Sequence, residues 1–555
     1  MIGVIADSAD REVVQEFFEL FKTPWEFYRG DREYDVLLCG GDGQFPATAK
    51  LAVVYAGRRL SFDDQQHIPI VPRQKQSSLL AFQGRRLPIY GQTATFEKNG
   101  PALLADEVNQ DSAAYLATRE GKMVARIGYD LFREVRTLLT AGQPLAYATS
   151  PTLELHIELL RSLIAGAGLG LLEIPPAPEG HPFMACLTHD VDHPSIRQHR
   201  WDHTAFGFFY RATWGSFGRL IRGQMSWRDV LTNWGAALKL PLVYAGLAAD
   251  FWQQFADRYL QLEKGRPSTF FVIPFRDEPG KSAQGLTPSF RAARYRAKDI
   301  ADVLERLRAA GHEVGLHGID AWIDGGRGSQ ELREIRDVTK TAEIGVRMHW
   351  LYFDENSPAV LEKAGAAYDS TVGYNEAVGY RAGTTQVYKH LNTTRLLELP
   401  LHVMDTALFY PTRMEASRSQ ASSILRSLAD DSARYGGVLT INWHDRSVLP
   451  ERLWDSCYRD LLADLQSRGA WFCTAGQAVS WFQKRRSVTF EIDSRGNPGA
   501  CLKVASGREE ALPALRLRTY KAAPSEPTMG RPAYDYADAP IRENVETSVP
   551  SGAGL

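Results

Sequence analysis

Short apolar runs alternate with amphipathic stretches through the first 180 residues. An apolar run at 2–5 leads through a polar segment into 11–21, where apolar side chains recur at helical spacing. Further runs of these two kinds follow, with strands predicted at 34–38, 51–55, 79–82 and 123–127 and helices at 129–140 and 152–165. The pattern predicts a small α/β unit over 1–75 and a mixed α/β unit over 76–180, which ends in a Pro-rich linker at 174–178.

From 181 to 485 the chain repeats a short apolar run followed by a helical stretch. The predicted strands lie at 183–188, 269–273, 313–316, 396–399, 438–443 and 470–474. Such alternation over about 300 residues is typical of an α/β fold with a parallel barrel or an open parallel sheet. A helical insertion at 195–262, rich in Trp and Arg, interrupts the pattern, and its tryptophans suit either stacking on sugar rings or the core.

The C-terminal part has a different pattern. Apolar runs at 487–492 and 515–520 predict a small β-rich extension over 486–524. The last segment, 525–555, has four prolines and little periodicity, so we expect a disordered tail there. No internal repeat is visible, which disfavours a solenoid or a propeller.

Composition narrows the function classes. The 555 residues carry 64 basic and 66 acidic side chains, so the net charge of −2 disfavours a nucleic-acid partner. No apolar stretch reaches the length of about 20 residues that a membrane span needs, and the first residues lack the pattern of a signal peptide. Five scattered cysteines suit a reducing compartment, so we expect a cytoplasmic location.

Chemically active side chains gather where predicted strands end. The segment 187–193 (LTHDVDH) follows the first strand of the 181–485 region and contains Asp190 and Asp192. Strand ends carry the catalytic groups of β/α barrels, and an Asp-x-Asp pair there can bind a metal through one carboxylate and take a proton with the other. The alternative is a polar turn whose carboxylates accept backbone hydrogen bonds.

Four later segments extend this pattern. His317 ends the strand at 313–316, Arg347 and His349 lie within 346–350, Asp405 follows 397–400, and His444 and Asp445 follow an apolar strand. An imidazole at such a strand end can bind a metal that Asp192 also holds. A buried structural histidine is the usual alternative for each one taken alone.

In order and spacing these segments resemble the polysaccharide deacetylase family, the NodB-homology or family 4 carbohydrate esterases, over 181–485. The resemblance implies a deacetylase-type (β/α) barrel, a divalent metal with zinc expected, and removal of N-acetyl or O-acetyl groups from a carbohydrate or glycan precursor. It also implies roles for five residues: Asp190 as general base, Asp192 and His317 as metal ligands, Arg347 as the group that orients the base, and His444 as catalytic acid.

The chain departs from the family pattern at two positions. Ala321 stands where the family has a second metal-binding histidine, and His349 stands where it has a proline. We therefore expect His349 to replace the missing ligand, with Asp320 and His193 as weaker rivals.

The resemblance also suggests substrate contacts. Tyr374 and Arg381 lie in a segment that looks like the substrate-side loop of one branch of the family, and a purely structural loop is the alternative. Leu439 fits the residue that lines the acetyl pocket, and Trp443 is a further candidate contact.

Two other functions stay open from the sequence. Ala321 favours a non-catalytic carbohydrate-binding protein on a degenerate barrel, whereas Asp190, Asp192, Arg347 and His444 favour the enzyme. An amidase for a small non-sugar amide is the third candidate, because a fold does not fix its substrate. The sequence leaves the oligomeric state unknown.

Overall fold

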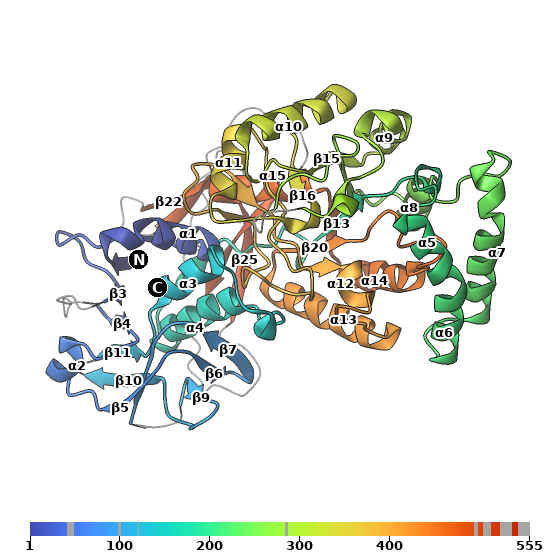
Figure 1. The fold of residues 1–555 in the computed structure, drawn as a ribbon. Coiled ribbons are helices and arrows are strands. Elements are labelled where there is room, and N and C mark those ends of the chain that lie inside the picture. Colours follow the sequence, from blue (N-terminus) through green and yellow to red (C-terminus); the bar gives the residue numbers. More distant parts are fainter. Residues whose placement is uncertain are drawn as a thin grey trace. The chain divides into compact units, whose positions relative to one another are not determined.

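The computed structural model describes residues 1–41, 49–97, 102–119, 121–282, 287–492, 498–502, 512–521 and 535–541. The chain forms two compact units (Figure 1). Unit 1 comprises Met1–Gly180, Ala382–Thr384 and Trp481–Leu555, and unit 2 comprises His181–Arg381 and Thr385–Ser480. Both expected N-terminal parts thus belong to one unit with the C-terminal extension.

Unit 1 is built on a six-stranded sheet with the order β10-β11-β4-β3-β1-β2. Its neighbours are parallel except for the hairpin β10–β11. The strands are β1 (Ile2–Ile5), β2 (Trp25–Phe27), β3 (Val36–Gly40), β4 (Leu51–Tyr55), β10 (Ala114–Arg119) and β11 (Lys122–Ile127). The helices are α1 (Arg11–Phe21), α2 (Ser61–Gln65), α3 (Leu131–Leu139) and α4 (Thr152–Gly166). The rings of Phe17 and Phe132 join α1 to α3, with their centroids 6.3 Å apart.

Smaller sheets complete unit 1. They use β5 (Ile70–Lys75), β6 (Ser78–Phe82), β7 (Arg85–Ile89), β8 (Thr93–Phe96), β9 (Ala105–Asp106), β12 (Leu171–Glu173), β22 (Val488–Ile492), β23 (Pro498–Leu502), β24 (Leu515–Tyr520) and β25 (Tyr536–Ile541). Strand β25 corrects our expectation of a disordered tail over 525–555, because it pairs along its whole length with β24. The other residues of that segment, apart from Asp535, lie outside the described residues.

Unit 2 contains the parallel sheet that the sequence predicts. The strand order is β16-β15-β14-β13-β20-β19, with β21 beside the first half of β13, and all these pairs are parallel. Parallel bridges carry the pairing on from Val346 to Asp369 and from Asp369 to Glu398. The sheet therefore curls in the manner of a (β/α) barrel, which confirms the predicted α/β fold class.

The strands of unit 2 are β13 (Met184–Val191), β14 (Thr269–Val272), β15 (Glu313–Gly318), β16 (Val346–Met348), β17 (Tyr388–Lys389), β18 (Leu397–Glu398), β19 (Val403–Met404), β20 (Val438–Asn442) and β21 (Trp471–Cys473). Their helices are α8 (Phe255–Glu263), α9 (Ala301–Ala309), α10 (Gly325–Thr339), α11 (Ser357–Ala364), α12 (Asp405–Phe409), α13 (Arg418–Tyr435) and α14 (Asp455–Ser467). Helix α15 (Ala475–Arg486) begins in unit 2, and its residues from Trp481 on belong to unit 1. The sheet strands are buried almost throughout, as expected for parallel strands covered on both faces.

The first strand of this sheet is longer than the apolar pattern suggests. Its predicted end is residue 188, but β13 continues through Val191 because pairing with β14 begins at Thr188 and runs to that residue. Asp190 thus lies inside the strand, and Asp192 is the first residue beyond it.

The segment 195–262 forms helices α5 (His203–Tyr210), α6 (Ser216–Ile221), α7 (Trp227–Tyr244) and α8. A π-helical turn, Arg211–Gly215, joins α5 to α6. Figure 1 shows α5, α6 and α7 in green at one edge of unit 2. Among the helices of the described ranges, none has the length and apolar character needed to cross a lipid bilayer.

Candidate active site

The ends of four parallel strands bring the predicted functional side chains together. Since the carboxyl ends of neighbouring parallel strands meet at one edge of the sheet, residues far apart in sequence become neighbours there. The contributors are Asp190 and Asp192 at the end of β13, His317 near the end of β15, Arg347 and His349 at β16, and His444 after β20.

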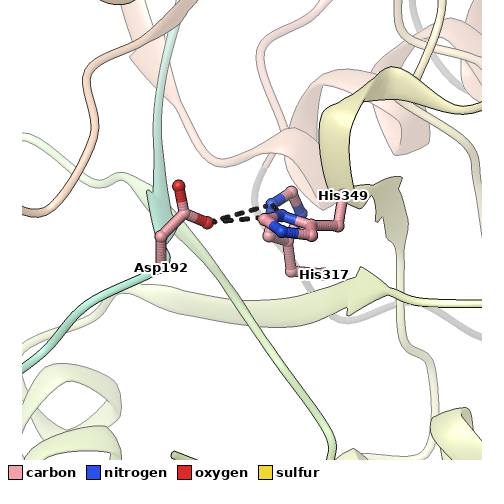
Figure 2. Close-up of side chains that lie close together, drawn as sticks. All are labelled: Asp192, His317 and His349. Carbon is pink, nitrogen blue, oxygen red and sulfur yellow. Dashed lines mark hydrogen bonds and ion pairs between the residues drawn. The ribbon is translucent and has the colours of Figure 1, made fainter. Parts of the chain in front are cut away.

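Three of these residues form a compact group of metal-type donors (Figure 2). Asp192 Oδ1 lies 3.4 Å from His317 Nε2 and 3.5 Å from His349 Nδ1. The two imidazole nitrogens are 3.0 Å apart. Tetrahedral zinc with bonds of about 2.0–2.2 Å separates its ligand atoms by about 3.3–3.6 Å. The two spacings from Asp192 fall within this range, and the two nitrogens lie slightly closer together than it.

Each imidazole has one nitrogen that faces the donor group and one, the outer nitrogen, that contacts a backbone carbonyl and so fixes the orientation of the ring. His317 Nδ1 lies 3.0 Å from the carbonyl oxygen of Arg347, and His349 Nε2 lies 3.1 Å from that of Arg291. A carbonyl accepts only, so each outer nitrogen carries a proton, and it is the inner nitrogen of the neutral ring that has a lone pair for a cation. Such an outer hydrogen bond is typical of metal-binding histidines.

Burial keeps this group in the form that binds a cation. Burial lowers the pKa of His349 to about 3, so its ring is neutral at physiological pH. Asp192 Oδ1 is buried and has no hydrogen-bond partner. Two imidazole nitrogens and an unsatisfied carboxylate oxygen thus lie close together, an arrangement that a divalent cation satisfies.

The rival ligands have other partners. Asp320 Oδ1 accepts a hydrogen bond from the backbone N–H of Lys281 at 2.6 Å. The ring of His193 contacts that of His199, with Nδ1 and Nε2 3.1 Å apart. The structure therefore joins His349, and neither of the weaker rivals, to the donor group.

Asp190 lies beside this group and is fixed through both oxygens. Its Oδ1 accepts from Arg347 Nη1 at 3.1 Å, and its Oδ2 accepts from Asn442 Nδ2 at 2.7 Å. Oδ2 is 3.9 Å from His317 Nε2. Asn442 had no predicted role, although its place at the end of β20, two residues before His444, was the available signal.

Arg347 is itself fully buried and orients Asp190. Its Nη1 also donates to Thr188 Oγ1 at 2.6 Å, and Nε and Nη2 donate to the carbonyl and hydroxyl oxygens of Ser370. Its guanidinium lies over the ring of Phe271, 4.5 Å from the centroid. These contacts fix the guanidinium in one orientation. A fixed orientation is what allows an arginine to hold a carboxylate in place.

His444 follows β20, which pairs with β13 on the side away from β14, and its side chain forms a pair with Asp405. Its Nδ1 lies 2.6 Å from Asp405 Oδ1, and its backbone N–H donates to Asp405 Oδ2 at 2.7 Å. Its Nε2 is left facing Asp192 Oδ2, 3.9 Å away. Although burial lowers the pKa of His444, the Asp405 carboxylate outweighs that effect and raises it to about 9.

The pairing with His444 gives Asp405 a role that the sequence did not assign. Asp405 begins helix α12, directly after β19, which is the neighbour of β20 in the sheet. Asp445 turns away, since its Oδ2 accepts from the His193 N–H at 2.7 Å and its Oδ1 from the Arg446 N–H at 2.8 Å.

The expected substrate contacts are buried to different degrees. Tyr374 is 8% exposed, and Arg381 is partly exposed and donates from Nη1 to the Gly373 carbonyl at 3.0 Å. Leu439 and Trp443 have no exposed surface and belong to the hydrophobic core. Because a core side chain presents no surface to a substrate, we correct the assignment of these two residues.

A cavity of about 190 Å³ opens beside the donor group. Asp192 and His349 form part of its wall, together with His203 and Thr204 from helix α5. The rings of Phe290 and Trp350, 5.5 Å apart, also line it. Arginines add positive charge to the lining: Arg211, Arg291 and Arg446.

A second buried cluster in unit 2 joins Asp369, His390 and Glu398. His390 Nε2 lies 3.1 Å from Glu398 Oε2 and 3.8 Å from Asp369 Oδ2. Burial and the neighbouring carboxyl group raise the pKa of Asp369 well above its usual range, and burial raises that of Glu398 to about 8. At least one of the two carboxyl groups is therefore protonated at neutral pH. The backbone of Asp369 forms the parallel bridges to Val346 and Glu398 described above.

Comparison with known proteins finds similar solved structures. No family model matches the chain, and no curated protein matches it. The solved structures similar to it include Agd3, a carbohydrate deacetylase, with 11% identity over 94% of this chain and 91% of that one, at a TM-score of 0.35. Another, from Mycobacterium smegmatis and provisionally described as a polysaccharide deacetylase, has 18% identity over 56% of this chain and 95% of the other, at a TM-score of 0.35.

A third similar structure is PuuE allantoinase, with 16% identity over 56% of this chain and 93% of that one, at a TM-score of 0.33. The Mycobacterium smegmatis structure is the one of these three whose description names a polysaccharide deacetylase, and that of Agd3 names a carbohydrate deacetylase. At these identities we argue the function from the side chains described above.

Proposed function

We propose that this chain is a metal-dependent hydrolase that removes N-acetyl or O-acetyl groups from a carbohydrate or glycan precursor. The observation that carries the proposal is the donor group of Asp192, His317 and His349 beside an anchored Asp190. Two imidazoles and one carboxylate are a common ligand set of catalytic zinc, so zinc is the expected ion. When bound, such an ion supplies Lewis acidity that polarises a carbonyl group and lowers the pKa of water.

Asp190 is suited to accept the proton of the attacking water. Arg347 and Asn442 hold its two oxygens in fixed positions. Its Oδ2 lies 3.9 Å from His317 Nε2, so a water at the donor group would be within hydrogen-bond reach of this oxygen.

His444 is suited to protonate the leaving group. With a pKa of about 9 its ring is protonated at neutral pH, and Nδ1–H is committed to Asp405. The remaining proton, on Nε2, points toward the donor group and is available to a departing nitrogen or oxygen. An amine is a poor leaving group unless it is protonated, so this acid is needed for an amide substrate.

The cavity favours a sugar over a strongly apolar substrate. Its lining combines charged and polar side chains with the ring faces of Phe290 and Trp350. Aromatic faces pack against the C–H surfaces of sugar rings, while polar groups bind hydroxyls.

The first test is metal content and zinc affinity. We expect stoichiometric zinc in the wild-type chain and a large loss of affinity in His317→Ala and in His349→Ala. His203→Ala is the matched control, because it removes an exposed cavity histidine that lies outside the donor group. The second test is acetate release from N-acetylglucosamine oligomers, which Asp190→Asn should abolish while leaving zinc affinity unchanged.

Two results would redirect the proposal. A wild-type chain that binds no zinc on titration, yet binds the oligomers, is the non-catalytic carbohydrate-binding protein. A chain that binds zinc and hydrolyses small acetamides but no acetylated sugar is an amidase of another substrate class.

A further inference from the structure

The helical insertion carries most of the large apolar side chains that the described residues expose. Thirteen of the eighteen exposed large hydrophobic residues lie within 201–247. Of the tryptophans that the sequence left as either sugar-stacking or core side chains, Trp201, Trp214, Trp227 and Trp234 are 38–85% exposed, and Trp252 is fully buried. Contiguous apolar surface of this kind is uncommon on monomeric proteins and marks an interaction site.

Helix α7 is apolar on two sides. Its inner side, represented by Ala236, Ala237, Leu240 and Val243, packs into the core of unit 2. Its outer side carries a second apolar row, which we call the outer stripe: Trp227, Leu231, Trp234, Leu238 and Leu242. These positions recur every three or four residues, so they line one face of the helix.

The segment α5–α6 repeats this feature. Phe206, Tyr210, Trp214, Phe217 and Ile221 follow one another at intervals of three or four residues and are all exposed. Figure 1 shows α5, α6 and α7 beside one another at the edge of unit 2. Trp234 of the outer stripe donates from Nε1 to the Thr213 carbonyl at 3.3 Å, which ties α7 to the turn between α5 and α6.

The charges of this segment have one predominant sign. Between His203 and Tyr244 there are five basic residues, Arg211, Arg219, Arg222, Arg228 and Lys239, and one acidic residue, Asp229. Arg222, Arg228 and Lys239 are exposed. The whole chain has a net charge of −2, so positive charge is concentrated on the insertion.

We propose that helices α5, α6 and α7 dock on the surface of a membrane that contains anionic phospholipid, without spanning it. Exposed Trp, Phe and Leu beside Lys and Arg are the composition of helices that lie in the plane of a bilayer interface. The exposed cations complement anionic headgroups. A second copy of the chain fits less well, because its insertion would bring the same positive charge against this one.

The docking surface is linked to the cavity through α5. His203 and Thr204 of that helix line the cavity, while Phe206 and Tyr210 of the same helix are exposed. A docked insertion thus holds the cavity close to the bilayer, where a membrane-bound substrate is within reach. The docking itself does not depend on the proposed hydrolase activity.

The test is flotation of the full chain with lipid vesicles. We expect binding to phosphatidylcholine vesicles with about one third phosphatidylglycerol, and at least about tenfold weaker binding to pure phosphatidylcholine. Raising salt from about 0.05 M to about 0.5 M should also weaken binding to the anionic vesicles.

Two variants separate the apolar and the electrostatic contributions. Trp227→Ser/Leu231→Ser/Leu238→Ser changes only exposed positions of the outer stripe, and Arg222→Glu/Arg228→Glu/Lys239→Glu reverses the exposed charges. Each should weaken binding to anionic vesicles at least about tenfold. Val108→Ser/Leu145→Ser, at exposed apolar positions of unit 1, is the matched control and should bind like the wild type.

The variants' circular dichroism and melting temperatures must match those of the wild type, since the substituted side chains face solvent. Absence of binding to anionic vesicles at low salt would overturn the proposal. Equal binding by the wild type and both insertion variants would overturn it as well. A dimer that the stripe variant abolishes, without any lipid binding, would instead assign the surface to a second copy of the chain.

Discussion

Replacing Arg347 by methionine removes the guanidinium that holds Asp190, and the consequence for stability is calculable from the burial of the pair. Arg347 has no exposed surface, and Asp190 is 3% exposed. Removing one partner of a buried ion pair leaves the other charge without compensation, which typically destabilises a protein by about 3–5 kcal/mol. The lost donors to Thr188 and Ser370 act in the same direction.

Most of that destabilisation is expected to come from the stranded carboxylate. A second substitution, Asp190→Asn, removes its charge and keeps an oxygen that can accept from Asn442. We therefore expect Arg347→Met/Asp190→Asn to be more stable than Arg347→Met alone, by about 2 kcal/mol or more. Methionine keeps much of the volume beside Phe271, so cavity formation contributes little to the difference.

The assay is urea unfolding of the four members of this double-mutant cycle, with the loss of unit 2 followed by tryptophan fluorescence. The quantity of interest is the coupling between the two substitutions in the free energy of unfolding. Strictly additive losses, or a double variant less stable than Arg347→Met, would refute the view that Arg347 acts chiefly by compensating Asp190. The cycle needs no substrate, so it tests the geometry separately from the activity.

Three further predictions concern the other groups of the barrel. His349→Ala should lower zinc affinity by more than about 100-fold, measured by competition with a chelator, because it removes a direct ligand and not a supporting group; Asp320→Asn should leave it unchanged. In Asp405→Asn the pKa of His444 should fall from about 9, because only Asp190 and Asp192 then oppose the lowering by burial, so the alkaline limb of kcat/KM moves to lower pH. An unmoved limb contradicts the pairing. The raised pKa of Glu398 means that the folded state binds its proton more tightly than the unfolded state does, so the free energy of unfolding falls as pH rises from about 4.5 through about 8. Urea unfolding at pH 5 and at pH 8 should show a smaller fall in Glu398→Gln than in the wild type.

The apolar pattern predicted the sheet of unit 2 well because parallel strands are buried on both faces. Strands β13, β14, β15 and β20 all begin within one residue of their predicted starts. The short strands β16 and β19 have only two or three residues, and their pairing depends on neighbours rather than on their own composition. In unit 1, β25 pairs with β24 from within a segment rich in proline, which local periodicity cannot reveal.

The chemical groups at strand ends were predictable where spacing and strand order sufficed. The alternation of strand and polar residue located Asp190, Asp192, His317 and His444, since each follows an apolar run. Asn442 and Asp405 were not assigned a role, because their contacts depend on side-chain directions across neighbouring strands. A hydrogen bond between residues 39 or more positions apart leaves no trace in the pattern of a single sequence.

His349 shows how one loss and one gain in a sequence can be connected by geometry. The position of Ala321 is buried and offers no ligand, whereas His349, 28 residues later, lies at the end of the adjacent strand and directs Nδ1 to the same point. Strands β15 and β16 pair in register from Leu316 to Gly318, so a histidine beyond either strand can reach the same place. A metal site can therefore exchange a ligand between neighbouring strand ends while its other two donors, Asp192 and His317, stay where they are.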